Sequence, residues 1–192
     1  MSIPEAEKTK RRFDAWDLAI MAMGIALITV CSWISIPLTV PFTLQTFAVC
    51  LIAAIFGFRR GLGAVGCYIL LGAVGAPVFA GFKGGFGALL GVTGGYIVGF
   101  LFTALVVGLA AERRGRKLKV LIPAMIVGIL LCYAFGTAWF VLVYTKNSGA
   151  IGVGTALAWC VLPYIPADAA KLLLASFLAV RLYPLVGRRP TT

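Results

Sequence analysis

Near the end of the chain the sequence reads PYIPADAAK, Pro163 to Lys171, where the last apolar run begins. Asp168 is the only acidic residue after Glu112, and Lys171 follows it by three positions. Residues three apart share one face of a helix. A carboxylate and an ammonium at the end of a membrane helix are costly unless they pair, face a cavity or meet a ligand. The pair therefore predicts a polar site at the start of the last helix.

The composition indicates an integral membrane protein. The 192 residues are 61% hydrophobic and only 12% charged, whereas soluble domains carry about 25% charged residues. This length accommodates about six spans of ~20 residues with short connections, and so predicts a single membrane domain. The net charge of +11 is explained by the excess of Lys and Arg in cytoplasmic loops, so nucleic acid is not an expected partner.

The sequence does not contain the residues that several kinds of functional site require. The chain has no histidine, and its five cysteines show no CxxC spacing and lie in apolar segments; we therefore expect no metal site. There is no GxxxxGK[ST] motif, so the chain is not expected to hydrolyse ATP by itself. No Ser/His/Asp set or pair of carboxylates is present either, and an enzyme or a bound cofactor is not expected.

Apolar runs, glycines and prolines predict an all-α bundle of six transmembrane helices. We expect spans at residues 16–34, 44–58, 62–76, 94–111, 120–144 and 167–186, with a short apolar helix at 151–162. Turns are expected at 59–61, 146–149 and 163–166. The membrane domain is thus residues 16–187, between an N-terminal tail, 1–15, and a C-terminal tail, 188–192. No cleaved signal peptide is expected, because the N-terminus has no small-residue cleavage pattern.

The basic residues predict the orientation. Fourteen of the 17 Lys and Arg fall at the two ends of the chain or in the second and fourth loops, which places both termini in the cytoplasm. The proline-containing loop 35–43, the glycine-rich stretch 77–93 and the start of the last span then share the extracellular face. Irregular backbone at membrane depth must be buried in protein or line a cavity. We therefore expect the stretch 77–93 to fold over a ligand site.

Asp168 and Lys171 have two interpretations. In the first, Asp168 only complements the helix dipole and Lys171 extends outward to water. In the second, they form a clamp in which Asp168 accepts hydrogen bonds from a small molecule and Lys171 donates to it. A lysine in the first turn is at the wrong end for the dipole, which favours the clamp.

Other polar candidates begin the apolar spans. Thr43, Gln45 and Thr46 precede or open the second span. Thr43 and Gln45 are candidate ligand contacts, although Thr43 is also suited to capping and Gln45 and Thr46 could face neighbouring helices. Tyr96 opens the fourth span and could lay its ring on a ligand. Lys83, in the glycine-rich stretch, is either a ligand contact or simply solvated.

Small residues recur along the first span at Ala19, Ala22 and Ala26. Small residues four apart allow close approach of another helix. The stripe is therefore either packed within the bundle or a docking face for a partner membrane protein.

These motifs together resemble the BioY family, the biotin-specific S components of energy-coupling-factor (ECF) transporters. The resemblance extends from the first span to the last and rests on motifs in family order: Ile36–Leu38, Val40–Phe47, Leu70–Gly81, Thr93–Tyr96, Gly136–Thr137, Leu162–Pro163, Pro166–Asp168 and Lys171. Departures from the family pattern are mild and include Gly91-Val92 where Gly-Pro is usual and Ala167 where Gly is common.

The resemblance implies a six-helix subunit of a prokaryotic plasma membrane that captures external biotin with high affinity. It implies that Asp168 and Lys171 are biotin ligands and that Ala22 and Ala26 meet a transmembrane coupling subunit, which works with two ATPase subunits. Phe79, within the resembling motifs, is expected to be an aromatic contact for the bicyclic ring of biotin.

Two functional hypotheses are compatible with the sequence. The first is a biotin-binding transporter subunit, or an S component for another small vitamin. The second is an unrelated small-solute channel or a membrane enzyme. The lack of histidine and paired carboxylates counts against the enzyme, and the scarcity of polar residues along the spans counts against a pore.

Overall fold

The computed structural model describes residues 14–38 and 40–187; the predicted tail 188–192 and all but two residues of the tail 1–15 lie outside them. The long helices are α1 (Ala15–Trp33), α2 (Gln45–Ala73), α4 (Gly94–Arg114), α5 (Leu118–Ser148) and α7 (Ile165–Leu182). Shorter elements are α3 (Phe86–Leu90), α6 (Val153–Cys160), 3-10 turns at Ala80–Phe82 and Leu162–Tyr164, and a π turn at Tyr183–Gly187. The all-helical membrane architecture expected from the composition is confirmed, since five helical stretches among the described residues are long and apolar enough to cross a membrane.

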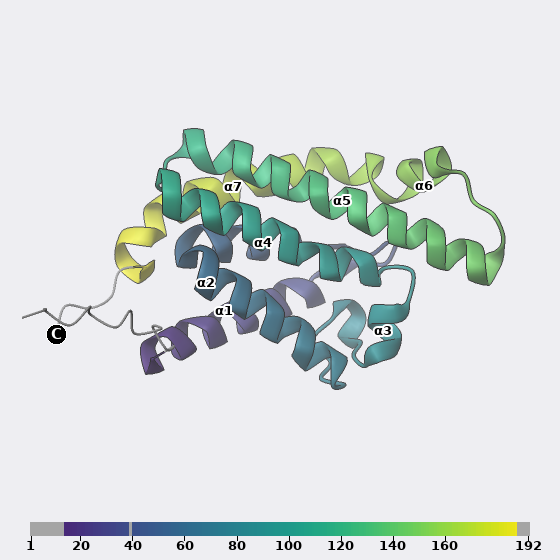
Figure 1. The fold of residues 1–192 in the computed structure, drawn as a ribbon, viewed down its shortest axis with the longest axis horizontal. Helices are drawn as coiled ribbons and strands as arrows, with labels where there is room; N and C mark the ends of the chain where they lie inside the picture. The colour runs from purple at the N-terminus through teal and green to yellow at the C-terminus, as the bar shows by residue number, and fades with distance from the viewer. Residues whose placement is uncertain (1–13, 39, 188–192) are drawn as a thin grey trace, which may run out of the picture.

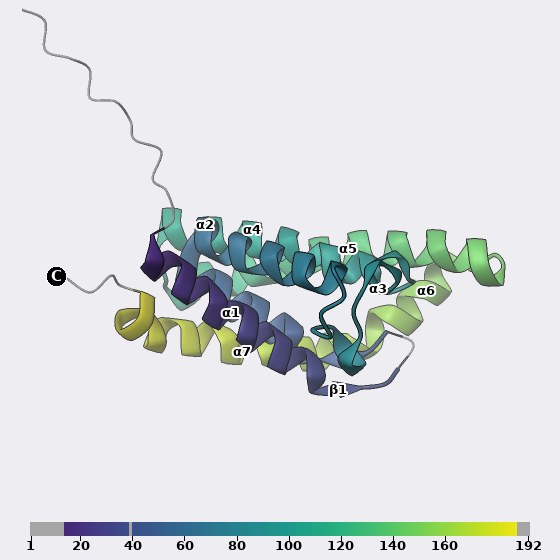
Figure 2. The same cartoon turned by 90° about the horizontal axis from the view of Figure 1, so that it is seen from below.

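The helices form an elongated bundle. Figure 1 shows α4 and α5 running side by side, and Figure 2 shows them on the opposite side of the bundle from α1 and α7. Glycines allow α4 and α5 to come close: a Cβ on Gly99 would meet Cys132, and one on Gly128 would meet Thr103. The start of α1 and the end of α7 lie at the same end of the bundle (Figure 1).

The chain reverses direction inside α2. Gly57 has φ 78° and ψ −169°, outside the helical region. The amide Nε2 of Gln45 lies 2.6 Å from the hydroxyl of Tyr68, although 23 residues of straight helix would span about 35 Å. Residues before and after Gly57 therefore run antiparallel, as the separate spans 44–58 and 62–76 predicted. The predicted turn at 59–61 is wrong, because these residues are helical and the reversal falls at Gly57.

The connections also refine the expected boundaries. The two ends of the predicted loop 35–43 are extended and pair as two short antiparallel strands, β1 (Ser35–Ile36) and β2 (Phe42–Thr43). The predicted turn at 146–149 is wrong for its first three residues, because α5 continues to Ser148. The turn at 163–166 is also displaced, because α7 already begins at Ile165 and Pro166 occupies its first turn, where a missing N–H costs nothing.

Two contacts from other segments support the reversal at Gly57. The backbone N–H of Phe58 donates to Oε1 of Glu112 at 2.9 Å, and Nε of Arg116 donates to the carbonyl of Ala54 at 3.0 Å. A Cβ on Gly57 would lie 2.4 Å from the same Glu112 oxygen. The turn therefore needs glycine both for its positive φ and for the space that Glu112 occupies.

We expect Gly57→Ala to lower the stability of the protein by about 1–3 kcal/mol, because the substitution strains the backbone and displaces Glu112 from Phe58. The measurement is the midpoint of thermal unfolding in detergent. Gly66→Ala is the matched control: Gly66 lies in the same element and a Cβ there would meet nothing within 4 Å. Equal midpoints for the two variants would contradict the role assigned to Gly57.

Candidate functional site

A cavity of about 630 Å³ lies within the bundle. This volume falls in the range of about 300–1,000 Å³ that is typical of small-molecule sites. Its wall is built by the loop 35–43, the start of α2, the glycine-rich stretch, α4, α5, the end of α6 and the start of α7. All seven residues predicted to contact a ligand line this one cavity: Thr43, Gln45, Phe79, Lys83, Tyr96, Asp168 and Lys171. Their contact with a ligand stays a prediction.

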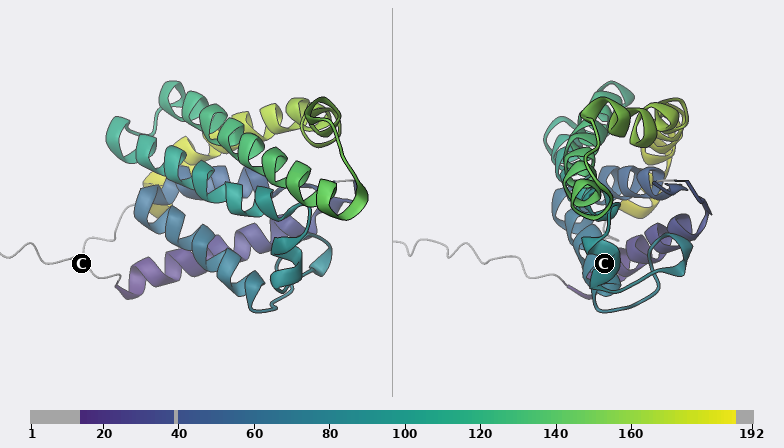
Figure 3. Two further views of the ribbon diagram at one scale, coloured as in Figure 1. Left: turned by 45° about the vertical axis from the view of Figure 1, so that its right-hand side comes forward. Right: turned by 90° about the vertical axis from the view of Figure 1, so that its right-hand side faces the viewer.

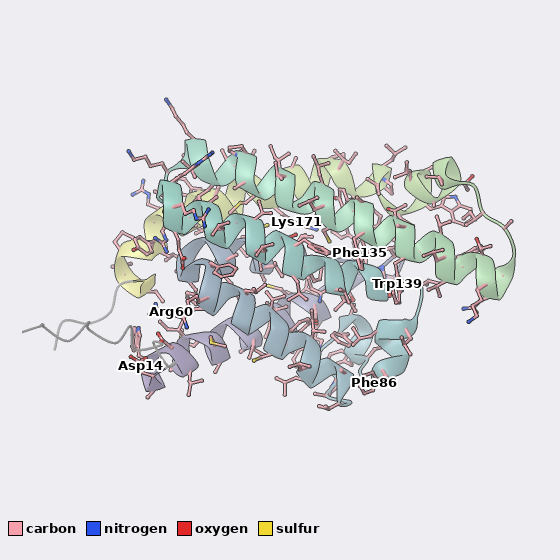
Figure 4. All side chains as sticks on the ribbon, viewed as in Figure 1. Asp14, Arg60, Phe86, Phe135, Trp139 and Lys171 are labelled. Atoms are coloured by element: carbon pink, nitrogen blue, oxygen red, sulfur yellow. The ribbon has the colours of Figure 1, made fainter. Side chains whose placement is uncertain are left out.

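Asp168 and Lys171 form a buried ion pair in the cavity wall. Nζ of Lys171 lies 2.8 Å from Oδ1 of Asp168, and the two residues are 8% and 5% exposed. Lys171 lies midway along the bundle in Figure 4, whereas Asp14 and Arg60 lie at one end. The interpretation in which Lys171 extends outward to water is therefore wrong. A buried pair of this kind is stable only when further hydrogen bonds satisfy both groups.

Three donors surround the carboxylate of Asp168. Oδ1 accepts from Lys171 at 2.8 Å and from the hydroxyl of Thr46 at 3.1 Å. Oδ2 accepts from the hydroxyl of Tyr133. Tyr133 was not among the predicted site residues, because it lies inside a long apolar run whose partner helix the sequence does not reveal. Its phenol, a polar group in the middle of a span, is the signal that could have found it.

The ammonium of Lys171 is held by protein groups as well. It donates to the backbone carbonyl of Thr43 at 2.7 Å and lies 3.4 Å from the hydroxyl of Thr46. It also lies 3.9 Å from the ring centroid of Phe42, a favourable cation–π position. Lys171 therefore links the start of α7 to β2 and to the start of α2.

Gln45 is the centre of a second polar group. It is 5% exposed, its Oε1 accepts from the hydroxyl of Thr43 at 3.2 Å, and its Nε2 donates to Tyr68. Tyr68 in turn donates to the carbonyl of Val78 at 3.0 Å. Gln45 thus borders the cavity and also connects α2 to the glycine-rich stretch.

Aromatic side chains supply much of the apolar wall. Phe79 is 2% exposed and packs edge-on against Tyr68, with ring centroids 5.5 Å apart. Its ring covers Gly72, where a Cβ would lie 2.0 Å from the Phe79 side chain. Tyr96 lines the cavity from α4, and its hydroxyl forms a hydrogen bond of 2.9 Å with the hydroxyl of Thr137. Both residues therefore contribute aromatic surface to the cavity wall.

The glycine-rich stretch lines one side of the cavity and is fastened near both ends. The indole N–H of Trp33 in α1 donates to the carbonyl of Pro77 at 2.9 Å, and the indole N–H of Trp139 in α5 donates to that of Gly91 at 3.0 Å. Figure 3 (left) shows this segment, with α3, beside the C-terminal end of α1. Lys83 belongs to the same stretch and lines the cavity. Its side chain is exposed, so water can solvate its ammonium and the charge needs no ligand.

The small residues Ala19, Ala22 and Ala26 lie away from the cavity and are all exposed on α1. Packing within the bundle therefore does not explain the stripe. Gly24, by contrast, is a small residue of this segment that packs inward, where a Cβ would meet Phe56 and Ala64. A docking role for the three alanines stays a prediction.

Comparison with known proteins agrees with this architecture. The model of the BioY family matches residues 7–188. The biotin transporter BioY of Thermotoga maritima is 42% identical over 165 residues, which is 85% of this chain and 94% of that protein. The probable biotin transporter BioY of Pyrococcus horikoshii is 36% identical over 169 residues, 88% of this chain and 96% of that protein.

A solved structure has the same fold. The crystal structure of the S-component for biotin from an ECF-type ABC transporter superimposes with a TM-score of 0.78 and 25% sequence identity, covering 90% of this chain and 95% of the other. The family model and the relatives each span most of the sequence, and the structural match spans most of the fold. This chain belongs to the BioY family.

Proposed function

We propose that this chain is the S component of an ECF transporter and captures biotin from outside the cell. The observation that carries the proposal is the cavity, which combines a buried carboxylate and ammonium with an aromatic wall. The relatives are named biotin transporters and the matching structure is an S component for biotin. The chain would bind and deliver biotin, and ATP hydrolysis would take place in other subunits.

Biotin fits the chemistry of this wall. Its ureido ring carries two N–H donors and one carbonyl, its thiophane ring is apolar, and its tail ends in a carboxylate. The carboxylate of Asp168 is an acceptor for a ureido N–H, and Lys171 is a donor for a carbonyl or carboxylate. Phe79 and Tyr96 offer apolar surface to the bicyclic rings, and Gln45, Thr43 and Lys83 add polar positions around them.

We also propose six membrane passes with both termini in the cytoplasm of a prokaryotic cell, in its plasma membrane. The reversal at Gly57 supports counting α2 as two passes. The two described ends of the chain lie at the same end of the bundle (Figure 1). Arg60 lies at that end too (Figure 4), in agreement with an excess of basic residues on the cytoplasmic side.

The expected partners are a transmembrane coupling subunit and two ATPase subunits. Ala19, Ala22 and Ala26 are exposed on α1 and would let a helix of the coupling subunit approach closely. The surrounding surface of α1 is apolar, with Met23 59% exposed and Val30 49% exposed, and would otherwise face lipid.

Removing either charge of the buried pair should weaken biotin binding. We expect Asp168→Asn and Lys171→Ala each to raise the Kd by about 30-fold or more, because each leaves the other charge buried without its partner. The measurement is a biotin titration of the purified chain by calorimetry. Lys146→Ala, which removes an exposed lysine of α5, should bind as the unaltered chain does. Undiminished binding by the Asp168→Asn, Lys171→Ala double variant would refute the site.

Larger side chains in the alanine stripe should reduce biotin transport without changing biotin binding. Ala22→Leu and Ala26→Leu should leave the biotin Kd unchanged, while weakening docking by about 1–3 kcal/mol through overpacking, which is about 5- to 150-fold. The measurement is ATP-dependent biotin uptake with the coupling and ATPase subunits, beside a titration of each variant alone. Ala134→Leu, at an exposed alanine of α5, is the control. Equal loss of binding and uptake would mean that the stripe serves the fold of the subunit.

A further inference from the structure

The two carboxylate oxygens of Asp168 differ in how many hydrogen-bond acceptor positions remain open to a ligand. A carboxylate oxygen has about two acceptor positions. Oδ1 already accepts from Lys171 and from Thr46, so both of its positions are filled. Oδ2 accepts only from Tyr133 among the described residues, which leaves one position. A ligand that donates to Asp168 therefore meets Oδ2, and the direction of the remaining position is set by the hydroxyl of Tyr133.

The three donors come from three different parts of the bundle. Thr46 belongs to α2, Tyr133 to α5, and Lys171 to α7 itself. Lys171 and Thr46 both hold Oδ1, so neither of them contacts Oδ2, the oxygen that keeps an open acceptor position. Tyr133 is the contact that fixes the second oxygen, and Tyr133 and Asp168 both line the cavity.

We propose that Tyr133 is a positioning residue for ligand recognition: its hydroxyl orients Asp168 so that Oδ2 presents one acceptor site to an N–H of the bound molecule. The proposal rests on the proposed function, in which that N–H belongs to the ureido ring of biotin. Tyr133 acts through Asp168, and its own contact with biotin is not required. Its hydroxyl donates a hydrogen bond to Asp168, so this edge of the cavity offers acceptors and favours ligands that donate.

The test compares Tyr133→Phe with the unaltered chain in detergent, using two probes, biotin and a biotin methylated on its ureido nitrogens. The variant keeps the ring and removes only the hydroxyl. We expect its affinity for biotin to fall by about 10- to 100-fold, as for loss of a hydrogen bond to a charged group. Its affinity for the methylated biotin, which cannot donate to Oδ2, should change by less than about threefold, so the preference for biotin should collapse.

A double-mutant cycle gives an independent measure. In an Asp168→Asn background the further change Tyr133→Phe should have little effect, because the group that Tyr133 orients is gone. Tyr144→Phe is the matched control, since Tyr144 lies on the same helix, packs against Phe140 and does not line the cavity; it should bind both probes as the unaltered chain does.

Three outcomes are decisive. A selective loss of biotin affinity in Tyr133→Phe, with Tyr144→Phe unchanged, supports the positioning role. Biotin binding by the unaltered chain, with equal losses for both probes or none in Tyr133→Phe, overturns this inference and leaves the proposed function standing. Failure of the folded, unaltered chain to bind biotin overturns the proposed function and this inference with it.

Discussion

The cavity depends on the buried ion pair between Asp168 and Lys171. A single charge inside a membrane protein is costly, and the pair is stable here because hydrogen bonds and an aromatic ring surround it. Lys171 donates a hydrogen bond to the backbone carbonyl of Thr43, which lies 128 positions earlier in the chain. Asp168 accepts hydrogen bonds from the hydroxyls of Thr46 and Tyr133. The pair therefore joins the start of α7 to α2 and α5, and any ligand that enters the cavity meets a polar cluster already assembled.

Another part of the cavity wall is the stretch between α2 and α4, most of which is not regular helix. Such backbone is tolerated at membrane depth only when protein covers it or it lines a cavity, and residues of this stretch, Phe79 and Gly91 among them, line the cavity. Trp33 and Trp139 fasten it near its two ends, and Tyr68 holds Val78 between them. Trp33 belongs to the helix that carries the exposed alanine stripe, so the surface proposed for the coupling subunit and the wall of the cavity share one rigid element.

The end of the bundle away from the cavity is built on different contacts. Asp17 of α1 pairs with Arg60 at 2.6 Å. Glu112 near the end of α4 and Arg116 just after it support the reversal at Gly57. Charged groups cost little desolvation free energy there, because that end contacts water in the proposed orientation. The molecule thus separates a cluster of charges at one end from the buried Asp168–Lys171 pair within the bundle.

The sequence by itself determined the class of the protein and the approximate extent of its helices, and it predicted seven residues that line the cavity. Hydrophobic runs and basic loops are local signals, and Asp168 and Lys171 are conspicuous because charges are rare in such runs. Only the tertiary structure decided where the chain reverses within α2, that the alanine stripe faces outward, and that Tyr133 reaches Asp168. These depend on which helices pack together: a tyrosine inside an apolar run gains a role only when packing brings a carboxylate from another helix to its hydroxyl.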